Sequence, residues 1–290
     1  MIERTSLQLA DGRQLDCFLA DGDGTAVVYH HGTPSCAIPP HAWADAFAER
    51  GLRYVAWSRP GYADSSRQEG RTVASVADDL RQVLDQLGIE RAYTIGWSGG
   101  GPHATAAAAL LPDRILGGAS VAGVAPYPAP GIDWYDGMGP ENVEEFGAAL
   151  EGNAALTSFL DRFYPVFSQV TADEIGEAFG GLVDHVDRGS LTGEFAENMA
   201  QTTREALRNG YWGWFDDDIA FTRDWGFALN AIAVPFHIWQ GSHDRMVPYA
   251  HGQWLADHVG SSCIHLHPDE GHLTLAVGGI GRILDGGRNR

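Results

Sequence analysis

Short apolar runs alternate with longer amphipathic stretches along most of this 290-residue chain, and this alternation constrains the fold more than any other feature. Residues 26–30 and 92–97 are apolar runs of strand length, whereas residues 73–87 carry Val and Leu at helical intervals. Such alternation is typical of a mostly parallel sheet flanked by helices, because each helix returns the chain to the same edge of the sheet. We therefore predict an α/β fold.

The alternation is interrupted in the middle of the chain. Residues 126–230 show helical patterns without convincing strands, and they contain 17 of the 30 aromatic residues. We predict a core made of residues 1–125 and 231–290, with residues 126–230 inserted as a helical cap. Such a cap would lie over the carboxyl ends of the strands, where open α/β sheets bind their ligands.

Charge and composition exclude several classes of function. The formal net charge is −19, which argues against nucleic-acid binding, because that binding relies on clustered Lys and Arg. All 19 basic residues are Arg, so no lysine is present. Schiff-base chemistry, a Ser-Lys dyad and phosphate binding by a P-loop are therefore excluded.

Nothing in the sequence directs the chain to a membrane. No apolar run reaches the roughly 18 residues that a membrane span needs, and the first four residues lack the character of a signal peptide. Cys17, Cys36 and Cys263 are widely spaced, which fits reduced thiols better than a disulfide framework or a zinc site. We expect a cytoplasmic protein without membrane or nucleic-acid partners, and the sequence leaves its oligomeric state open.

The segment Gly96-Trp97-Ser98-Gly99-Gly100 lies between a predicted strand and a predicted helix. A turn this tight places its central serine in strained backbone geometry, so the flanking positions 96 and 100 must be small. The Gly99 amide would then point toward a substrate at the helix N-terminus. We predict that Ser98 is a nucleophile; the alternative is a glycine-rich loop with an incidental serine.

A serine hydroxyl is a weak nucleophile without a base, and His272 is the best candidate among 12 histidines. It follows the last predicted strand, as expected for the chain order nucleophile, acid, histidine. Asp244 follows the preceding strand, where a buried carboxylate would fix the imidazole tautomer and stabilise the imidazolium. Asp269 and Glu270 are rivals for the acid, although neighbours in sequence rarely reach the distal ring nitrogen.

Two further sets of residues are candidates for substrate contacts. His31-Gly32-Thr33-Pro34 follows the first core strand, and the backbone amides of Thr33 and Gly99 can together hold the oxyanion of a tetrahedral intermediate. Aromatic residues beside the nucleophile or in the cap are candidates for an apolar pocket wall, although each one alone is better explained by core packing. They are Trp97, Trp134, Tyr135, Tyr211, Trp212 and Trp214.

Taken together, these segments resemble the α/β-hydrolase superfamily, in the branch with a helical cap after the sixth strand. The resemblance covers essentially the whole chain. Residues 58–65 resemble the family's loop after its fourth strand, usually written D-x-R-G-x-G-x-S, with departures that affect no catalytic role. Members with an aspartate nucleophile, including haloalkane dehalogenases and epoxide hydrolases, lack the elbow serine, so Ser98 argues against both activities. The proline-iminopeptidase branch typically shows HGGPG, from which Thr33-Pro34-Ser35 departs.

The residues and the resemblance lead us to expect a serine hydrolase that forms an acyl-enzyme. Ser98 would attack a carbonyl carbon while His272 takes its proton, and a water activated by the histidine would then release the acyl group. Small carboxylic esters or lactones are the expected substrates, because an alkoxide leaves more easily than an amine. No metal or organic cofactor is implied.

Two alternatives stay open. One is a proline-iminopeptidase-like aminopeptidase, in which cap carboxylates such as Glu144 or Glu145 would bind a substrate α-ammonium group. These charges also fit a solvated helix face. The other is a non-catalytic small-molecule receptor on the same fold, against which an intact set of Ser98, His272 and Asp244 argues, because binding alone needs no activated nucleophile.

Overall fold

Eight strands form a single sheet in the computed structural model, which describes residues 2–286. Met1 and residues 287–290, the last four of the predicted core segment 231–290, lie outside the described residues. The strand order is β1-β2-β4-β3-β5-β6-β7-β8. The strands are β1 (Glu3–Gln8), β2 (Gln14–Ala20), β3 (Ala26–His30), β4 (Arg53–Trp57), β5 (Ala92–Trp97), β6 (Ile115–Val121), β7 (Phe236–Gly241) and β8 (Ser262–His267).

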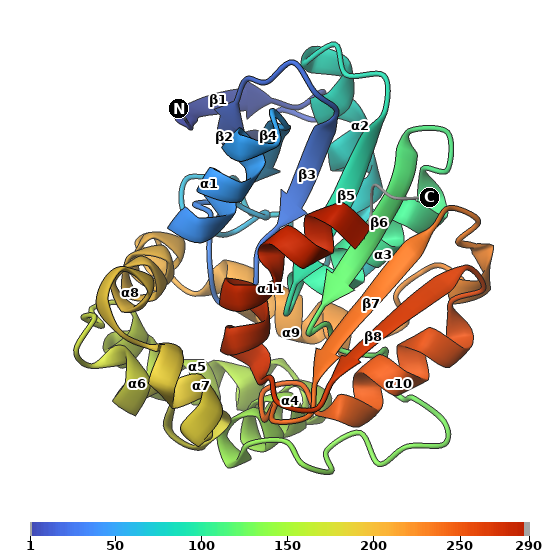
Figure 1. The fold of residues 1–290 in the computed structure, drawn as a ribbon. Coiled ribbons are helices and arrows are strands. Elements are labelled where there is room, and N and C mark those ends of the chain that lie inside the picture. The colour runs from blue at the N-terminus through green and yellow to red at the C-terminus, as the bar shows by residue number, and fades with distance from the viewer. Residues whose placement is uncertain (1, 287–290) are drawn as a thin grey trace.

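The sheet is mostly parallel, as the alternation predicts. The pairs β1–β2 and β2–β4 are antiparallel, and every other neighbouring pair is parallel. All residues of β3 and of β7 are buried, which is expected of parallel strands that are covered on both faces. Because the parallel strands point the same way, their carboxyl ends meet at one edge of the sheet (Figure 1).

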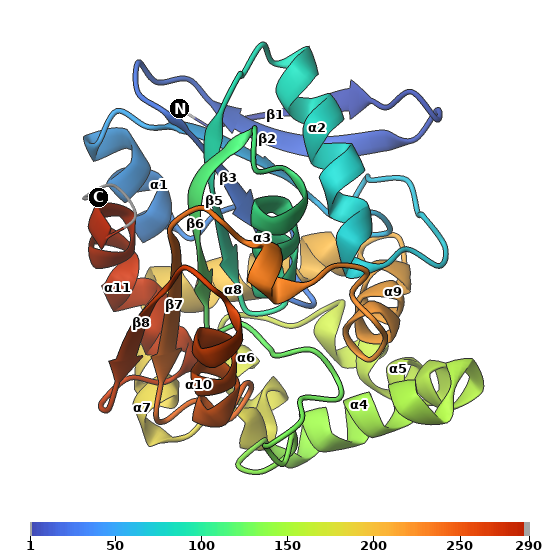
Figure 2. The same ribbon diagram turned by 90° about the vertical axis from the view of Figure 1, so that its right-hand side faces the viewer.

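Helices cover both faces of this sheet (Figure 2). Buried side chains of α1 and α11 belong to one hydrophobic cluster, and those of α2, α3 and α10 belong to the cluster on the other face. The apolar stripe predicted over residues 73–87 buries Leu80, Val83 and Leu84. The bounds are α1 (His41–Glu49), a 3₁₀ turn (Val73–Ser75), α2 (Val76–Gln86), α3 (Gly100–Leu110), α10 (Tyr249–His258) and α11 (His272–Gly286).

A helical insertion separates β6 from β7 and lies at the carboxyl ends of the strands (Figure 1). Its position after the sixth strand is the one that the resemblance implies. Among residues 2–286, no helix combines the length and the apolar character needed to cross a membrane. The insertion contains α4 (Pro140–Glu151), α5 (Asn153–Phe167), α6 (Ile175–Ala178), α7 (His185–Ser190), α8 (Gly193–Leu207) and α9 (Trp212–Phe221), with 3₁₀ turns at Gly180–Leu182 and Leu229–Ala231.

Candidate active site

Ser98 occupies the sharp turn between β5 and α3. Its φ is +56°, a left-handed conformation that costs a residue with a Cβ roughly 1–2 kcal/mol. The glycines on either side allow this turn, because a Cβ at position 96 would overlap the backbone of Gly100, and one at position 100 would overlap the backbone of His30. The Ser98 amide donates to the Val121 carbonyl at 2.9 Å, which fixes the turn against β6.

His272 and Asp244 form a buried hydrogen-bonded pair. The Nδ1 atom of His272 lies 2.8 Å from Oδ2 of Asp244, and both side chains are at most 1% exposed. The carboxylate is itself held in place, because its Oδ1 accepts the backbone amides of Met246 and Val247, and Oδ2 accepts the side-chain amide of Gln240. Among the described residues, the imidazole is hydrogen-bonded to Asp244 and not to the rival acids Asp269 and Glu270.

The environment of His272 suits a group that accepts a proton. Burial alone would lower the pKa of His272, but the charge and hydrogen bond of Asp244, and the charge of Asp187, raise it above its ordinary value. Its Nε2 atom is buried without a hydrogen-bond partner among the described residues. His272, Ser98 and Trp97 line the same cavity, which has a volume of about 420 Å³ including space open to solvent.

The backbone amides of Thr33 and Gly99 are available for a ligand. Neither amide donates a hydrogen bond to any group within residues 2–286. Both residues line the large cavity beside Ser98, and the two loops are so close that a Cβ on Gly99 would overlap the Thr33 hydroxyl. Two unpaired amides next to a candidate nucleophile can stabilise a developing oxyanion.

A buried ion-pair network holds the Thr33 loop, and sequence reasoning did not find it. Asp217 of α9 pairs with Arg59 at 2.6 Å and with Arg71 at 2.7 Å, and it accepts the Thr33 hydroxyl at 2.6 Å. Arg59 also donates to the Gly32 carbonyl at 2.9 Å. Burial would raise the pKa of Asp217, but the two guanidinium groups hold it well below its ordinary value. The network thus ties the insertion to the loop that carries one of the two free amides.

A second contact from the insertion reaches the histidine itself. Asp187 of α7 is fully buried, and its two carboxylate oxygens accept the backbone amides of His272, Leu273 and Thr274 at 2.8–3.1 Å. These amides form the first turn of α11, where an acidic side chain satisfies unpaired donors and complements the helix dipole. A cap from a distant segment leaves no local pattern, so no signal in the sequence points to Asp187.

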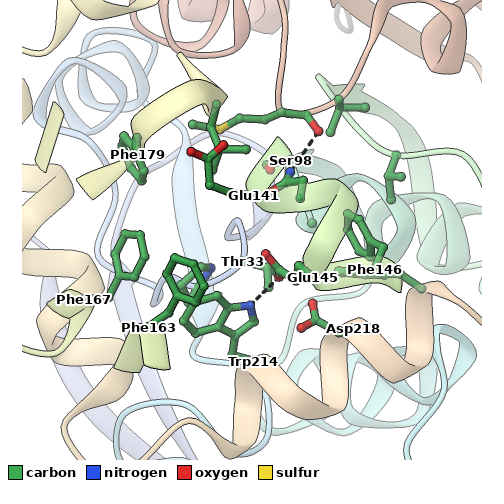
Figure 3. A pocket seen from close by; sticks show the side chains of 18 of the residues that line it. Thr33, Ser98, Glu141, Glu145, Phe146, Phe163, Phe167, Phe179, Trp214 and Asp218 are labelled. Atoms are coloured by element: carbon green, nitrogen blue, oxygen red, sulfur yellow. Dashed lines mark hydrogen bonds between the residues drawn. The ribbon is translucent and has the colours of Figure 1, made fainter. Parts of the chain in front are cut away.

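The largest cavity near Ser98 lies between the sheet edge and the insertion. It measures about 770 Å³ including space open to solvent. In Figure 3 the rings of Phe163, Phe167 and Phe179 lie on one side of the view and the ring of Phe146 lies on the other, with the carboxyl groups of Glu145 and Asp218 between them. Glu145 accepts a hydrogen bond from the Trp214 indole at 2.6 Å. The adjacent Glu144 is exposed and pairs with Arg162, so of the two cap carboxylates proposed for an ammonium group only Glu145 faces the cavity.

Of the six aromatic residues predicted as pocket walls, Trp214 and Trp97 border the two cavities beside Ser98. The other four lie elsewhere, and the prediction is corrected for them. Trp134 packs against Phe146 and His251, and Tyr135 packs against Trp134. Tyr211 donates to Asp161 at 2.8 Å, and Trp212 is 41% exposed beneath the Arg67 guanidinium. None of these four rings lines either of the two cavities.

Comparison with known proteins identifies the family. Residues 25–278 match the profile of the alpha/beta hydrolase fold. The chain belongs to this family. A non-heme chloroperoxidase from Streptomyces lividans is 30% identical to this α/β hydrolase over 230 residues, which are 79% of this chain and 77% of the relative. A bifunctional esterase/perhydrolase from Acinetobacter calcoaceticus is 26% identical over 78% of this chain and 77% of its own length.

Solved structures agree on the fold. A bromoperoxidase from Bacillus anthracis superimposes on this α/β hydrolase with a TM-score of 0.73 at 21% identity, covering 99% of this chain and all of that one. An alpha/beta hydrolase fold protein from Nakamurella multipartita gives a TM-score of 0.66 at 23% identity, with 96% and 95% coverage. The named relatives include hydrolases and esterases, and this chain is accordingly an enzyme of the α/β-hydrolase fold.

Within the described residues of this α/β hydrolase, the ligand atoms of one group of side chains lie close enough together to hold a metal ion. Ligand atoms of Asp184, His185 and His243 lie within 4.8 Å of one another. The group is at the surface, where His185 is 82% exposed. The contacts already present explain it, because Asp184 caps α7 and accepts a hydrogen bond from His243 at 2.8 Å.

Proposed function

We propose that this α/β hydrolase cleaves a small carboxylic ester or lactone through an acyl-enzyme intermediate on Ser98. The observation that carries the proposal is the shared cavity: Ser98, on its strained turn, and His272, whose Nδ1 atom is held by the buried Asp244, border the same space. A binding protein has no need of this combination, whereas acyl transfer requires a nucleophile, a base and a group that orients the base.

The proposed reaction begins with proton transfer. His272 Nε2 takes the Ser98 proton as Oγ bonds to the carbonyl carbon, and the carbonyl oxygen becomes an oxyanion held by the Thr33 and Gly99 amides. The tetrahedral intermediate then collapses, the bond to the alkoxide breaks, and the imidazolium returns its proton to that oxygen. Water, deprotonated by His272, attacks the acyl-enzyme and releases the carboxylic acid and Ser98.

We further propose that the insertion acts as a cap, with residues 126–230 as its extent. The insertion supplies most of the aromatic wall of the large cavity, and such a wall favours an apolar acyl or alcohol group. The names of the relatives include a chloroperoxidase and an esterase/perhydrolase, and they do not single out one substrate. We take esters and lactones as the substrates because their leaving alkoxide is easier to expel than an amine.

The test is hydrolysis of p-nitrophenyl esters with acyl chains of increasing length, by the wild type and by Ser98→Ala. We expect turnover by the wild type and a loss of roughly 10⁴-fold or more in kcat for the variant, as when other triad nucleophiles are removed. A fluorophosphonate should label the wild type at Ser98. Equal activity of the two proteins would contradict the role of Ser98, and failure of both hydrolysis and labelling would favour a receptor.

A further inference from the structure

Two cavities meet at Ser98, and they border different parts of the candidate site. The large cavity of about 770 Å³ and the smaller one of about 420 Å³, both including space open to solvent, share six lining residues. His272 lines only the smaller cavity, whereas Gly99 lines only the large one. The candidate nucleophile therefore lies where the two spaces join. The shared residues are Thr33, Pro34, Ser98, Phe167, Phe179 and Met246.

The proposed reaction directs the two halves of an ester in different directions from Ser98. In the tetrahedral intermediate the carbonyl carbon carries the Ser98 oxygen, the oxyanion, the acyl chain and the leaving oxygen. The leaving oxygen must come within hydrogen-bond reach of His272, because the imidazolium donates the proton that releases it. The leaving alcohol is thus directed to the cavity that His272 lines, and the acyl chain extends away from the histidine.

The wall of the large cavity suits a bulky apolar group. Trp214 and Phe163 belong to this wall and do not line the smaller cavity (Figure 3). The Trp214 indole already donates to Glu145 at 2.6 Å, so it needs no polar partner from a ligand. A chain buried against such rings gains free energy roughly in proportion to its apolar area. The rings that line the large cavity alone are Phe146, Phe159, Phe163, Trp214 and Phe221.

The large cavity offers no cation to an anionic group. Within the described residues its lining includes the carboxyl groups of Glu141, Glu145 and Asp218, and no Arg or His. Glu145 and Asp218 are hydrogen-bonded to each other. Burial raises the pKa of Glu145 to about 7 and the pKa of Asp218 well above its ordinary value, so this pair holds a proton at neutral pH. A carboxylate on the acyl chain would be buried here without a counter-ion, which is costly.

We propose that the large cavity takes the acyl group of the substrate and that the smaller cavity takes its alcohol. The substrate class is then an ester of a bulky apolar acid, without a second carboxylate, and a small alcohol. This inference rests on the proposed acyl transfer, and it decides which half of the ester each cavity holds. Phe163 of α5 and Thr203 of α8, which line one cavity each, would determine specificity for the two halves.

Two isomeric esters test the assignment. Methyl phenylbutyrate and phenylpropyl acetate, each with a terminal phenyl group, have the same composition and carry the same phenylalkyl body on opposite sides of the ester. We expect the wild type to hydrolyse methyl phenylbutyrate with a kcat/KM roughly 10-fold higher or more, the discrimination that an apolar pocket gives for a methylene or a larger group. Each value is divided by the rate of alkaline hydrolysis of the same ester, which removes differences in intrinsic reactivity. Equal values, or a preference for phenylpropyl acetate, would overturn the assignment.

A charged substrate tests the missing cation. Methyl phenylbutyrate with a carboxylate at the para position of its ring is compared with the same ester carrying a neutral carboxamide there. The carboxylate should lower kcat/KM by on the order of 100-fold relative to the carboxamide, because its charge would be buried without a partner. Equal turnover of the two esters would mean that the acyl group does not enter the large cavity.

Variants that narrow one cavity at a time locate the effect. Phe163→Trp should lower the ratio of kcat/KM for methyl phenylbutyrate to that for phenylpropyl acetate, and Thr203→Phe should raise it. Tyr164→Trp is the control on α5, because Tyr164 packs against Tyr211 and lines neither cavity. Thr203→Val keeps the volume of threonine and removes only its hydrogen bond to the Met199 carbonyl, so it controls for loss of the hydroxyl. An unchanged or opposite ratio in both narrowed variants, with thermal unfolding midpoints near that of the wild type, would refute the assignment.

The same measurements separate this inference from the proposed function. Ser98-dependent hydrolysis of p-nitrophenyl acetate, together with an absent or reversed preference between the isomers, would leave the hydrolase proposal standing and reject the assignment of the cavities. If the wild type hydrolyses none of these esters and a fluorophosphonate does not label it, the proposed function fails and the assignment fails with it.

Discussion

The Asp187 carboxylate accepts the backbone amide of His272 at 2.8 Å, so a side chain of the insertion holds the residue that we propose as the catalytic base. Asp187 lies 85 residues before His272 in the chain. Its charge also contributes to the raised pKa of the imidazole. The insertion is therefore coupled to the candidate base both by geometry and by charge, and not only through the walls of the cavity.

Asp187→Asn should lower the stability of the protein and shift the pH profile of kcat/KM. Losing a charged helix cap should lower the free energy of unfolding by about 1–2 kcal/mol, because the amide group of Asn cannot accept all of the hydrogen bonds. Removing the negative charge should lower the pKa of His272, so the acidic limb of the kcat/KM profile should move to lower pH. If Asp187 served only a structural role, the variant would lose stability while the acidic limb of its kcat/KM profile stayed in place.

The control for this experiment is Asp136→Asn, an exposed aspartate in the same insertion. It should change neither the urea midpoint nor the pH profile. An acidic limb that moves upward in Asp187→Asn, or equally in both variants, would contradict the electrostatic role of Asp187.

Asp217→Asn should be among the most destabilising single substitutions in the chain. It leaves Arg59 and Arg71 buried without their counter-ion, each with a side chain 2% exposed, and such an unpaired charge costs about 3–5 kcal/mol. Urea denaturation measures this loss. Asp216→Asn is the neighbouring control, because its partner Arg67 is 27% exposed and can turn to water. Comparable losses of unfolding free energy in the two variants would contradict the high cost that we assign to leaving Arg59 and Arg71 unpaired.

The sequence predicts those parts of the candidate site that depend on local structure. Ser98 was found because a strand, a tight glycine-flanked turn and a helix occur within a few residues of one another. Asp244 and His272 follow the ends of successive strands, and parallel strands bring their carboxyl ends to one edge. The mostly parallel sheet and the position of the insertion followed from the same alternation of patterns.

The contacts between the insertion and the core could not be predicted in this way. Asp187 and Asp217 meet their partners across large separations in sequence, and no local pattern distinguishes the acidic run at residues 216–218 from a cluster exposed to solvent. A single step along α4 decides whether Glu144 or Glu145 faces the cavity. Successive residues point about 100° apart around a helix, so one side chain reached the cavity while the other reached solvent. Helical periodicity in the sequence does not show which of two adjacent polar residues faces the cavity, because that depends on how α4 packs against the core.

Ser98→Gly should be more stable than Ser98→Ala. Both variants lack the hydroxyl, but only alanine keeps the Cβ that makes the φ of +56° unfavourable. The difference in unfolding free energy should be about 1 kcal/mol in favour of glycine, after the greater flexibility of its unfolded chain is taken into account. Thermal unfolding of the two inactive proteins measures it. A more stable alanine variant would mean that the turn relaxes when the hydroxyl is removed.

Stability should also depend on pH through the carboxyl pair of the cavity. The pKa of Glu145 is raised from 4.5 in the unfolded chain to about 7 in the folded protein, so its stabilising contribution is complete below pH 4.5 and is lost as the pH rises through 7. Glu145→Gln removes this titration while keeping an oxygen for the Trp214 indole. The midpoint of the variant relative to the wild type should therefore rise by on the order of a few degrees between pH 6 and pH 8. Glu144→Gln should show no such change, and a parallel shift in both variants would mean that general surface charge, rather than the buried pair, sets the dependence.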